Sequence, residues 1–347
     1  MQVRELSREA YEAVLEGLGV TPPVEQLPVW QDYEASIPGR SPWGFVAVED
    51  RGAVVAAAAL TQYETHGYRY LRAHHAPVWS AAAGEPSAEQ EAAVLEALVD
   101  FVRGRDKRQV FMRLAVDHEL PQTRPCLSTL PYDTTVVIDV TGSEDDILSR
   151  MKPRGRRDVR KSLRECPCAL ADETDAATAD FAPYYEIMRE TGERDGFTPA
   201  PLSDFQDMVR ILGPKHARVY AGRNDGELVA WSLVTVSGGR ATRYYAATAI
   251  GSGRLRVADA LLLFECERVA ELGCSSYDLM GIGSAFSPET MNLNEFKTKF
   301  AKDGVVRIAP DRDVPVKRGF YGALVKVRDL RDGVRARRAG AREKDGE

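Results

Sequence analysis

The chain has 347 residues, a net charge of −6, 44% apolar residues and 28% charged residues. This length predicts two domains, and this composition is typical of a globular protein with an ordinary core. The excess of acids excludes nucleic-acid binding through bulk charge, so any such contact needs a local basic patch. The most apolar run, 53–60, is too short to cross a bilayer, and five cysteines without metal-ligand spacing indicate a reducing compartment. We therefore expect a cytoplasmic protein.

The first half of the chain alternates strand patterns with helix patterns. Residues 4–18 are patterned as a helix, and 86–103 as a second one. Ser87 followed by Gln90 is the capping box expected at the start of that second helix. The expected strands of this half are 45–48, 54–60, 68–74 and 110–116.

The second half repeats this theme without clear residue identity. A strand at 134–140 leads into a helix at 143–151 that begins with Ser143 as its cap. Further helices are expected at 179–191, 202–212 and 257–272, and further strands at 217–223, 228–236, 242–248 and from 277. The pattern predicts an α/β fold with mixed sheets. We place the domains at 1–140 and 141–314, with the basic helix 315–347 available to pack back on the first domain through Leu324, Val327 and Leu330.

A dense basic stretch runs through residues 150–164, RMKPRGRRDVRKSLR, against a single acid. Arg156 and Arg160 share one helical face, Arg157 lies on the adjoining row, and Lys152 precedes them. Val159 and Leu163 are expected to anchor the opposite side. Such a face suits phosphates of RNA or of a diphosphate substrate, although a merely solvated helix face fits the pattern equally well.

Other familiar site patterns are incomplete. The loop IGSGRLR, 250–256, could hold a phosphate at a helix N-terminus, but it lacks the third glycine of a dinucleotide fingerprint. No nucleophile elbow is present, and the five histidines lack metal-ligand spacing, so we expect neither a covalent nucleophile nor a metal.

The stretch 277–304 holds a glycine-ended strand followed by a turn-rich loop and a helix. Phe296 and Phe300 lie on one face of that helix, with Lys297 beside them. On spacing alone, an amphipathic helix with solvated lysines is the simpler interpretation.

Five segments in order along the chain change that interpretation: LSRMKPRGRRDVRKSLRE, TGERDGF, RYYAATAIGSG, ECERVAELGCSSYDLMGI and NEFKTKFAKDGVV. Together these collinear segments resemble the FemABX aminoacyltransferases over most of residues 130–310. The resemblance implies two tandem acetyltransferase-like (GNAT-like) domains, of the type without a coiled-coil arm. It also implies transfer of an amino acid from aminoacyl-tRNA onto a side-chain amine of a peptidoglycan precursor, lipid-linked or UDP-linked, without a cofactor.

The resemblance also implies roles for individual residues. Phe296 and Lys297 resemble the pair that contacts the RNA terminus and stabilises the oxyanion. Arg194, Tyr244 and Tyr245 resemble residues that contact the acceptor. We assign phosphate contact with the tRNA to Lys152, Arg156, Arg157 and Arg160.

The first half matches the family only in outline. PVWQDYE, which contains Trp30, resembles the family's substrate-binding aromatic segment, but Glu34 stands where a lysine is expected. A carboxylate there would repel a diphosphate, so a changed acceptor such as a peptide antibiotic stays open. An acyl-CoA-dependent N-acyltransferase and a non-catalytic RNA- or precursor-binding protein also stay open. We expect a monomer that touches the inner membrane face peripherally.

Overall fold

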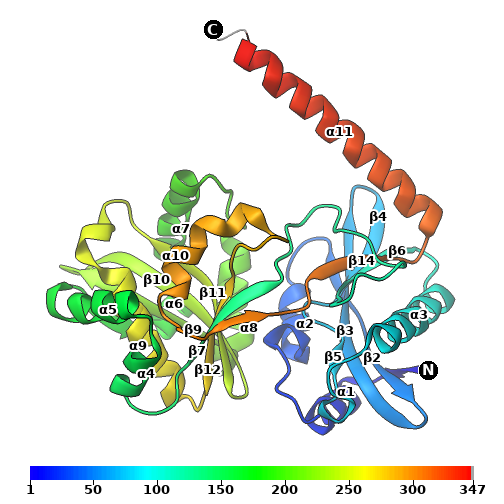
Figure 1. Cartoon of the computed structure of the whole chain (residues 1–347), viewed down its shortest axis with the longest axis horizontal. Helices are drawn as coiled ribbons and strands as arrows, with labels where there is room; N and C mark the ends of the chain where they lie inside the picture. The colour runs from blue at the N-terminus through cyan, green and yellow to red at the C-terminus, as the bar shows by residue number, and fades with distance from the viewer. Residues whose placement is uncertain (345–347) are drawn as a thin grey trace. The chain divides into compact units, whose positions relative to one another are not determined.

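The computed structural model describes residues 1–344, which divide into two compact units. The first unit contains Met1–Gly19, Gly39–Pro131 and the chain from Ala309 onward; the second contains Val20–Pro38 and Tyr132–Ile308. Each unit is built on one seven-stranded sheet with helices packed against it (Figure 1). The mixed α/β fold predicted from the sequence is confirmed. Segment 20–38 joins the second unit although the flanking chain belongs to the first.

The sheet of the first unit has the strand order β1-β2-β3-β4-β6-β14, with β5 paired to β3. Among the described strands of this sheet, the β4–β6 pair is parallel and the other pairs are antiparallel. The strands are β1 (Gln2–Leu6), β2 (Arg40–Asp50), β3 (Ala53–Thr65), β4 (Tyr68–Arg72), β5 (Val78–Trp79), β6 (Gln109–Ala115) and β14 (Asp311–Pro315).

The main helix of this unit is α3 (Ala88–Arg105). Ser87 and Gln90 form the predicted capping box, in which each side chain bonds the other residue's backbone N–H. Its apolar side faces the sheet with Val94, Leu95, Leu98 and Val102 fully buried. The other helices are α1 (Arg8–Gly17) and α11 (Arg318–Lys344).

The first residues of the chain differ from the predicted helix 4–18. Gln2–Leu6 form strand β1 and pair with β2, and the helix begins only after Ser7, whose hydroxyl accepts from the Ala10 N–H. The pairing partner lies some forty residues away in sequence, so a local helical pattern could not reveal it. The cap then fixes where the helix starts.

The sheet of the second unit has the order β13-β7-β12-β11-β10-β9-β8, and its one parallel pair among the described strands is β11–β12. The strands are β7 (Thr134–Asp139), β8 (Ala169–Asp172), β9 (Ala217–Asn224), β10 (Glu227–Ser237), β11 (Arg240–Thr248), β12 (Ser276–Gly281) and β13 (Val305–Arg307). The strands expected at 217–223, 228–236 and 242–248 are all present.

Helices cover both faces of this second sheet (Figure 1). One core lies under α4, α5 and α9, and the other under α2, α7 and α8. The helices are α2 (Pro28–Glu34), α4 (Glu144–Arg150), α5 (Pro153–Glu165), α6 (Thr174–Ala179), α7 (Ala182–Asp195), α8 (Leu202–His216), α9 (Val257–Glu271) and α10 (Asn294–Thr298).

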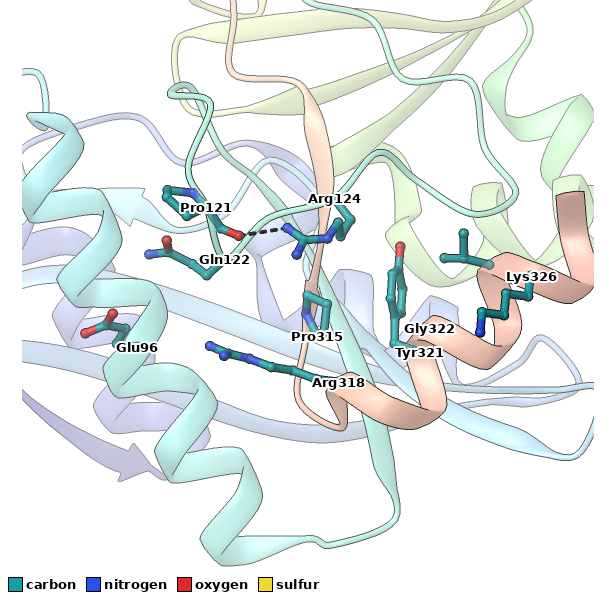
Figure 2. A pocket seen from close by; sticks show the side chains of 10 residues that line it. Glu96, Pro121, Gln122, Arg124, Pro315, Arg318, Tyr321, Gly322 and Lys326 are labelled. Atoms are coloured by element: carbon teal, nitrogen blue, oxygen red, sulfur yellow. Dashed lines mark hydrogen bonds between the residues drawn. The ribbon is translucent and has the colours of Figure 1, made fainter.

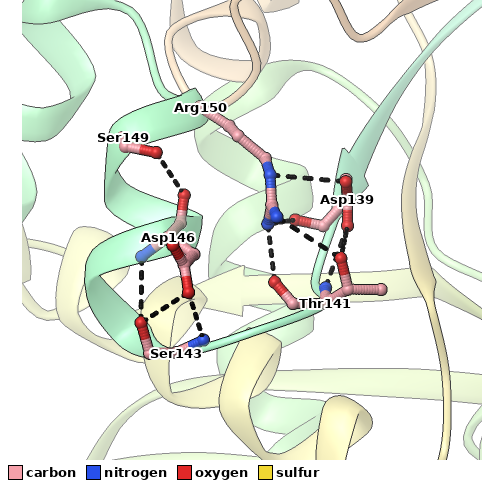
Figure 3. Close-up of polar contacts among 6 residues, drawn as sticks. All are labelled: Asp139, Thr141, Ser143, Asp146, Ser149 and Arg150. Atoms are coloured by element: carbon pink, nitrogen blue, oxygen red, sulfur yellow. Dashed lines mark hydrogen bonds and ion pairs between the residues drawn. The ribbon is translucent and has the colours of Figure 1, made fainter.

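Helix α4 begins as the sequence predicts. Ser143 caps it, and the Asp146 carboxylate accepts from the Ser143 N–H at 2.8 Å and from its hydroxyl at 2.7 Å (Figure 3). The hydroxyl of Ser149 donates back to the Asp146 carbonyl. Arg150 donates to the Thr141 carbonyl at 2.6 Å and pairs with Asp139 at 3.3 Å (Figure 3). Arg150, the first cation of the basic stretch, therefore fixes the β7–α4 turn.

The start of α11 packs on the first unit through buried Tyr321 and partly buried Leu324. Val327 and Leu330, which we expected to pack there too, are 64% and 72% exposed, so that expectation is wrong beyond the second turn. No helix within residues 1–344 carries an apolar stretch as long as a bilayer crossing requires.

Candidate active site

The two parallel strands of the second sheet separate at one end. Strands β11 and β12 pair only through Arg240–Thr242 and Ser276–Asp278, although β11 continues to Thr248 and β12 to Gly281. Beyond that point β11 stays paired with β10 alone. At these ends, backbone groups of β11 and β12 are not used in pairing the two strands with each other. Ligands are commonly bound at such a point of a sheet.

The backbone at the end of β12 is closely fixed. Met280 has φ of 62°, in the left-handed region that non-glycine residues rarely adopt. A Cβ on Gly281 would lie 2.5 Å from the Tyr132 ring, so only glycine fits. Further along, the Asn294 side chain accepts from the Gly283 N–H at 2.7 Å and donates to the Gly283 carbonyl at 2.9 Å. These two hydrogen bonds connect the loop after β12 to the start of α10.

Lys297, on α10, binds the end of β12. Its Nζ donates to the Gly281 carbonyl at 2.8 Å and to the Met280 carbonyl at 3.3 Å. Among the described residues it forms no ion pair. An ammonium has three N–H donors, so one remains for a ligand.

Burial is the main reason why the pKa of Lys297 falls from its ordinary value to about 8. The positive charge of Arg243 lowers the pKa further, and Asp278 partly offsets both. A lysine with this pKa is able to donate a hydrogen bond to a developing oxyanion and to exchange a proton near neutral pH. The arrangement therefore suits acyl transfer to an amine.

Lys299, two residues later, is held very differently. Its Nζ pairs with Asp259 at 2.6 Å and Asp158 at 3.6 Å, and it lies 5.0 and 4.9 Å from the ring centroids of Phe296 and Phe300. The side chain is only 11% exposed. Lys299 is thus a paired structural cation, whereas Phe296 is a partly buried ring that packs edge-on against Phe300.

A buried ionic network lies behind the site. Glu265, fully buried on α9, pairs with Arg243 Nε at 3.0 Å and accepts from the hydroxyls of Tyr277 and Ser232, each at 2.6 Å. The network fixes the position of Arg243, whose charge acts on Lys297. Sequence reasoning singled out neither Arg243 nor Glu265, although they open two of the five collinear segments. Only the fold brings these two residues together.

Asp278 holds β12 in place below Lys297. It accepts from the Thr135 hydroxyl and pairs with Arg240, and its Oδ1 accepts from the Met280 N–H at 2.8 Å. The last bond supports the unusual backbone conformation at Met280. The neighbouring strands β7 and β11 are thereby connected through one carboxylate.

The predicted acceptor-binding aromatics form one cluster in the second unit. The Tyr244 ring lies 5.3 Å from both Tyr245 and Trp30, and Tyr245 packs on Phe205 at 4.7 Å. Burial raises the pKa of the Tyr244 hydroxyl well above its ordinary value. Trp30 is only 3% exposed and donates its indole N–H to Glu34 at 3.2 Å. Trp30 is therefore a core residue that supports the cluster, and Glu34 is buried beside it.

Arg194 lies at the C-terminal end of α7. Its Nη1 donates to the Thr248 carbonyl at 3.1 Å, and its Nε and Nη2 donate to Asp195 at 2.8 and 3.0 Å. Arg194 is thus attached to the far end of β11, the strand that carries Tyr244 and Tyr245.

The predicted basic face lies on α5. The side chains of Arg157 and Arg160 are 73% and 54% exposed, with single acidic neighbours at 3.5 and 4.0 Å. Arg156 donates to the Ser149 carbonyl, and Leu163, expected to be an anchor, is 49% exposed, so that expectation is wrong. Val159, which is fully buried, anchors the helix as expected.

The start of α5 contacts the segment that carries the two lysines. The Lys152 N–H donates to the Lys299 carbonyl at 3.1 Å, and a Cβ on Gly155 would lie 2.0 Å from that same oxygen. Glycine is required for this close approach. The basic face therefore begins next to α10.

The chain is similar to known proteins in its domain family and in its fold. Residues 153–297 match the acetyltransferase (GNAT) domain family. The crystal structure of FemX is similar over 93% of this chain and 99% of that chain, with a TM-score of 0.71 and 15% identity. A tandem GNAT protein from the clavulanic acid biosynthesis pathway is similar over 91% of this chain and 98% of that chain, with a TM-score of 0.53 and 13% identity. L-PGS from Bacillus licheniformis is similar over 94% of this chain and 98% of that chain, with a TM-score of 0.52 and 13% identity. No curated protein matches the chain in sequence.

These similarities confirm the FemABX-type fold predicted from the five segments, and the tandem GNAT architecture with it. The family match and the fold together support an acyltransferase.

Proposed function

We propose that this acyltransferase moves an amino acid from aminoacyl-tRNA onto a side-chain amine of a peptidoglycan precursor. The observation that carries the proposal is Lys297, a partly buried cation with a lowered pKa whose hydrogen-bond acceptors are neutral carbonyls. The FemX-type fold around it supports the same reaction class. Lipid-linked and UDP-linked precursors are both acceptors of this kind, the first of which requires contact with the inner membrane face.

The reaction needs no covalent enzyme intermediate. The acceptor nitrogen attacks the ester carbonyl, the new C–N bond forms, and the C–O bond to the ribose breaks as the tetrahedral oxyanion collapses. The proton lost by the amine ends on the ribose oxygen. The free N–H of Lys297 stabilises the oxyanion, and Phe296 stacks on the terminal base of the tRNA.

The remaining residues bind the two substrates in this proposal. Arg156, Arg157 and Arg160 contact phosphates of the acceptor arm, with Lys152 at the start of the same helix. Arg194 and the partly buried rings of Tyr244 and Tyr245 contact the acceptor. Buried Glu34 supports the aromatic cluster instead of contacting a diphosphate.

A second candidate is an acyl-CoA-dependent N-acyltransferase, which the GNAT domain match favours. The loop Gly251–Arg256 precedes α9 in this domain, with Gly251 at φ of 82° and Arg256 at φ of 55° paired to Glu165. Such a loop can bind a pyrophosphate at the helix start.

The test incubates the purified chain with precursor and either charged tRNA or acyl-CoA, followed by mass spectrometry of the acceptor. An added aminoacyl mass that requires charged tRNA supports the proposal. Transfer from acyl-CoA alone supports the second candidate. Binding of RNA or precursor without transfer from any donor contradicts both, and peptide-antibiotic acceptors are tested in the same format.

A further inference from the structure

The first unit contains a pocket of about 680 Å³ to which none of the proposed catalytic residues belongs. It lies between α3, the loop 121–124, β14 and the start of α11, and the side chains of these elements surround it (Figure 2). Its size is within the range of small-molecule sites.

The charged groups around the pocket are mainly cations. Arg124, Arg318 and Lys326 contribute three positive charges, and Glu96 contributes one negative charge. Arg318, Lys326 and Glu96 make no ion pair with any residue of the described chain. Arg124 Nη1 donates to the Pro121 and Thr123 carbonyls at 2.7 and 2.6 Å, which fixes its side chain while no described carboxylate neutralises it. The pocket therefore favours an anion.

Apart from the amide of Gln122, the rest of the wall is apolar, and part of it is held by hydrogen bonds. Pro121, Pro315 and Val325 line it together with the ring of Tyr321. Tyr321 is 3% exposed, and its hydroxyl lies 3.1 Å from Asp313 Oδ2, which is itself paired with buried Arg113. A wall fixed in this way needs little reorganisation when a ligand binds.

Gly322 keeps the pocket open on the α11 side. Glycine weakens a helix interior. A Cβ at Gly322 would meet no atom within 4 Å, so packing against the rest of the protein does not explain why glycine stands here. A larger side chain would extend into the pocket that Gly322 lines. Gly319, one turn earlier, also has open space around it but does not line the pocket.

We propose that this pocket binds a small organic anion, with a phosphate or carboxylate group attached to an apolar or aromatic body. The guanidinium groups of Arg318 and Arg124 would bind the anion by paired hydrogen bonds, and Lys326 would add a point charge. The apolar body would contact Tyr321 and the prolines.

The test is calorimetric titration of the full chain with phenyl phosphate and with phenylacetate, which separate the two anion chemistries. Inorganic phosphate and phenol serve as probes of the charge alone and of the ring alone. We expect at least one aromatic anion to bind about tenfold or more tightly than either partial probe. No binding of either aromatic anion at millimolar concentration overturns the proposal.

Two matched pairs of variants localise the binding. Arg318→Gln should weaken it about tenfold, whereas Arg328→Gln, which removes the same charge from the Asp329-paired arginine on the same helix, should not. Gly322→Leu should abolish binding, whereas Gly319→Leu should leave it, with circular dichroism checking that both variants fold. Equal effects within either pair overturn the assignment to this pocket.

Discussion

Among the described strands, each sheet contains one parallel pair, and the charged side chains near the two pairs differ in their partners. In the first unit, Arg113 on β6 donates to Asp313 on β14 at 2.7 and 3.1 Å, and both side chains are at most 1% exposed. In the second unit, the acceptors of Lys297 among the described residues are the neutral carbonyls at the end of β12, and burial lowers its pKa to about 8. A buried charge that is bonded to a counter-ion supports the fold, whereas a cation that donates to neutral acceptors is characteristic of a functional site.

The largest effect should come from removing Lys297. Lys297→Met should lower the transfer rate about 10²- to 10⁴-fold, the range for loss of one oxyanion donor or proton-transfer group. Single-turnover assays with charged tRNA measure the rate, and thermal melting checks that the fold is retained. A wild-type rate in this variant would remove Lys297 from the mechanism.

The second effect concerns stability of the first unit. Arg113→Met leaves Asp313 buried without its partner, so unfolding free energy should fall by about 3–5 kcal/mol. Urea denaturation measures this change. The double variant Arg113→Met with Asp313→Leu should recover much of the loss, and a single variant as stable as the wild type would contradict the structural interpretation.

The third effect concerns the basic face of α5. Neutralising Arg156, Arg157 and Arg160 to Gln should weaken tRNA-dependent activity about tenfold at physiological salt, and the salt dependence should become shallower by about 0.7–0.9 in log–log slope per lost phosphate contact. Replacing Arg103, Arg189 and Arg210 by Gln removes the same number of charges from arginines that pair with acids on α3, α7 and α8, and is the matched control. An unchanged salt slope would mean that the α5 face is only solvated.

The smallest effect is the pH dependence of the rate. Because the pKa of Lys297 is about 8, the ammonium form that stabilises the oxyanion is lost as pH rises through 8. The rate should therefore fall several-fold between pH 7.5 and about 9 relative to Lys297→Arg, whose guanidinium stays charged. A ratio of the two rates that is constant with pH would argue against the charged form as the active one.

Local patterns were sufficient for much of the fold. The capping boxes at Ser87 and Ser143 define the starts of α3 and α4 in the structure as the sequence predicts. The short-range chemistry of a cap involves only three or four consecutive residues, so sequence alone reveals it. Strand β1 was missed because its pairing partner β2 lies far along the chain.

The candidate site was predicted less completely. Lys297 was proposed from the resemblance alone. The structure adds a physical difference between the two lysines, because Lys299 pairs with Asp158 and Asp259. Trp30 was expected to contact substrate but lies in the core against Glu34. Burial of a single aromatic side chain depends on what packs over it, which no local pattern specifies.

By itself, the sequence predicted the two-part α/β architecture, the helix caps and, through the five collinear segments, an acyltransferase. The tertiary structure decided that Arg113 and Lys299 pair with carboxylates, whereas Lys297 donates to neutral carbonyls. The reason is physical: the pKa of Lys297 depends on burial and on Arg243, which is 54 positions away along the chain (297 − 243) and is fixed by Glu265 on another element. Electrostatic environments of this kind arise from distances through space, and only the folded sheet sets those distances.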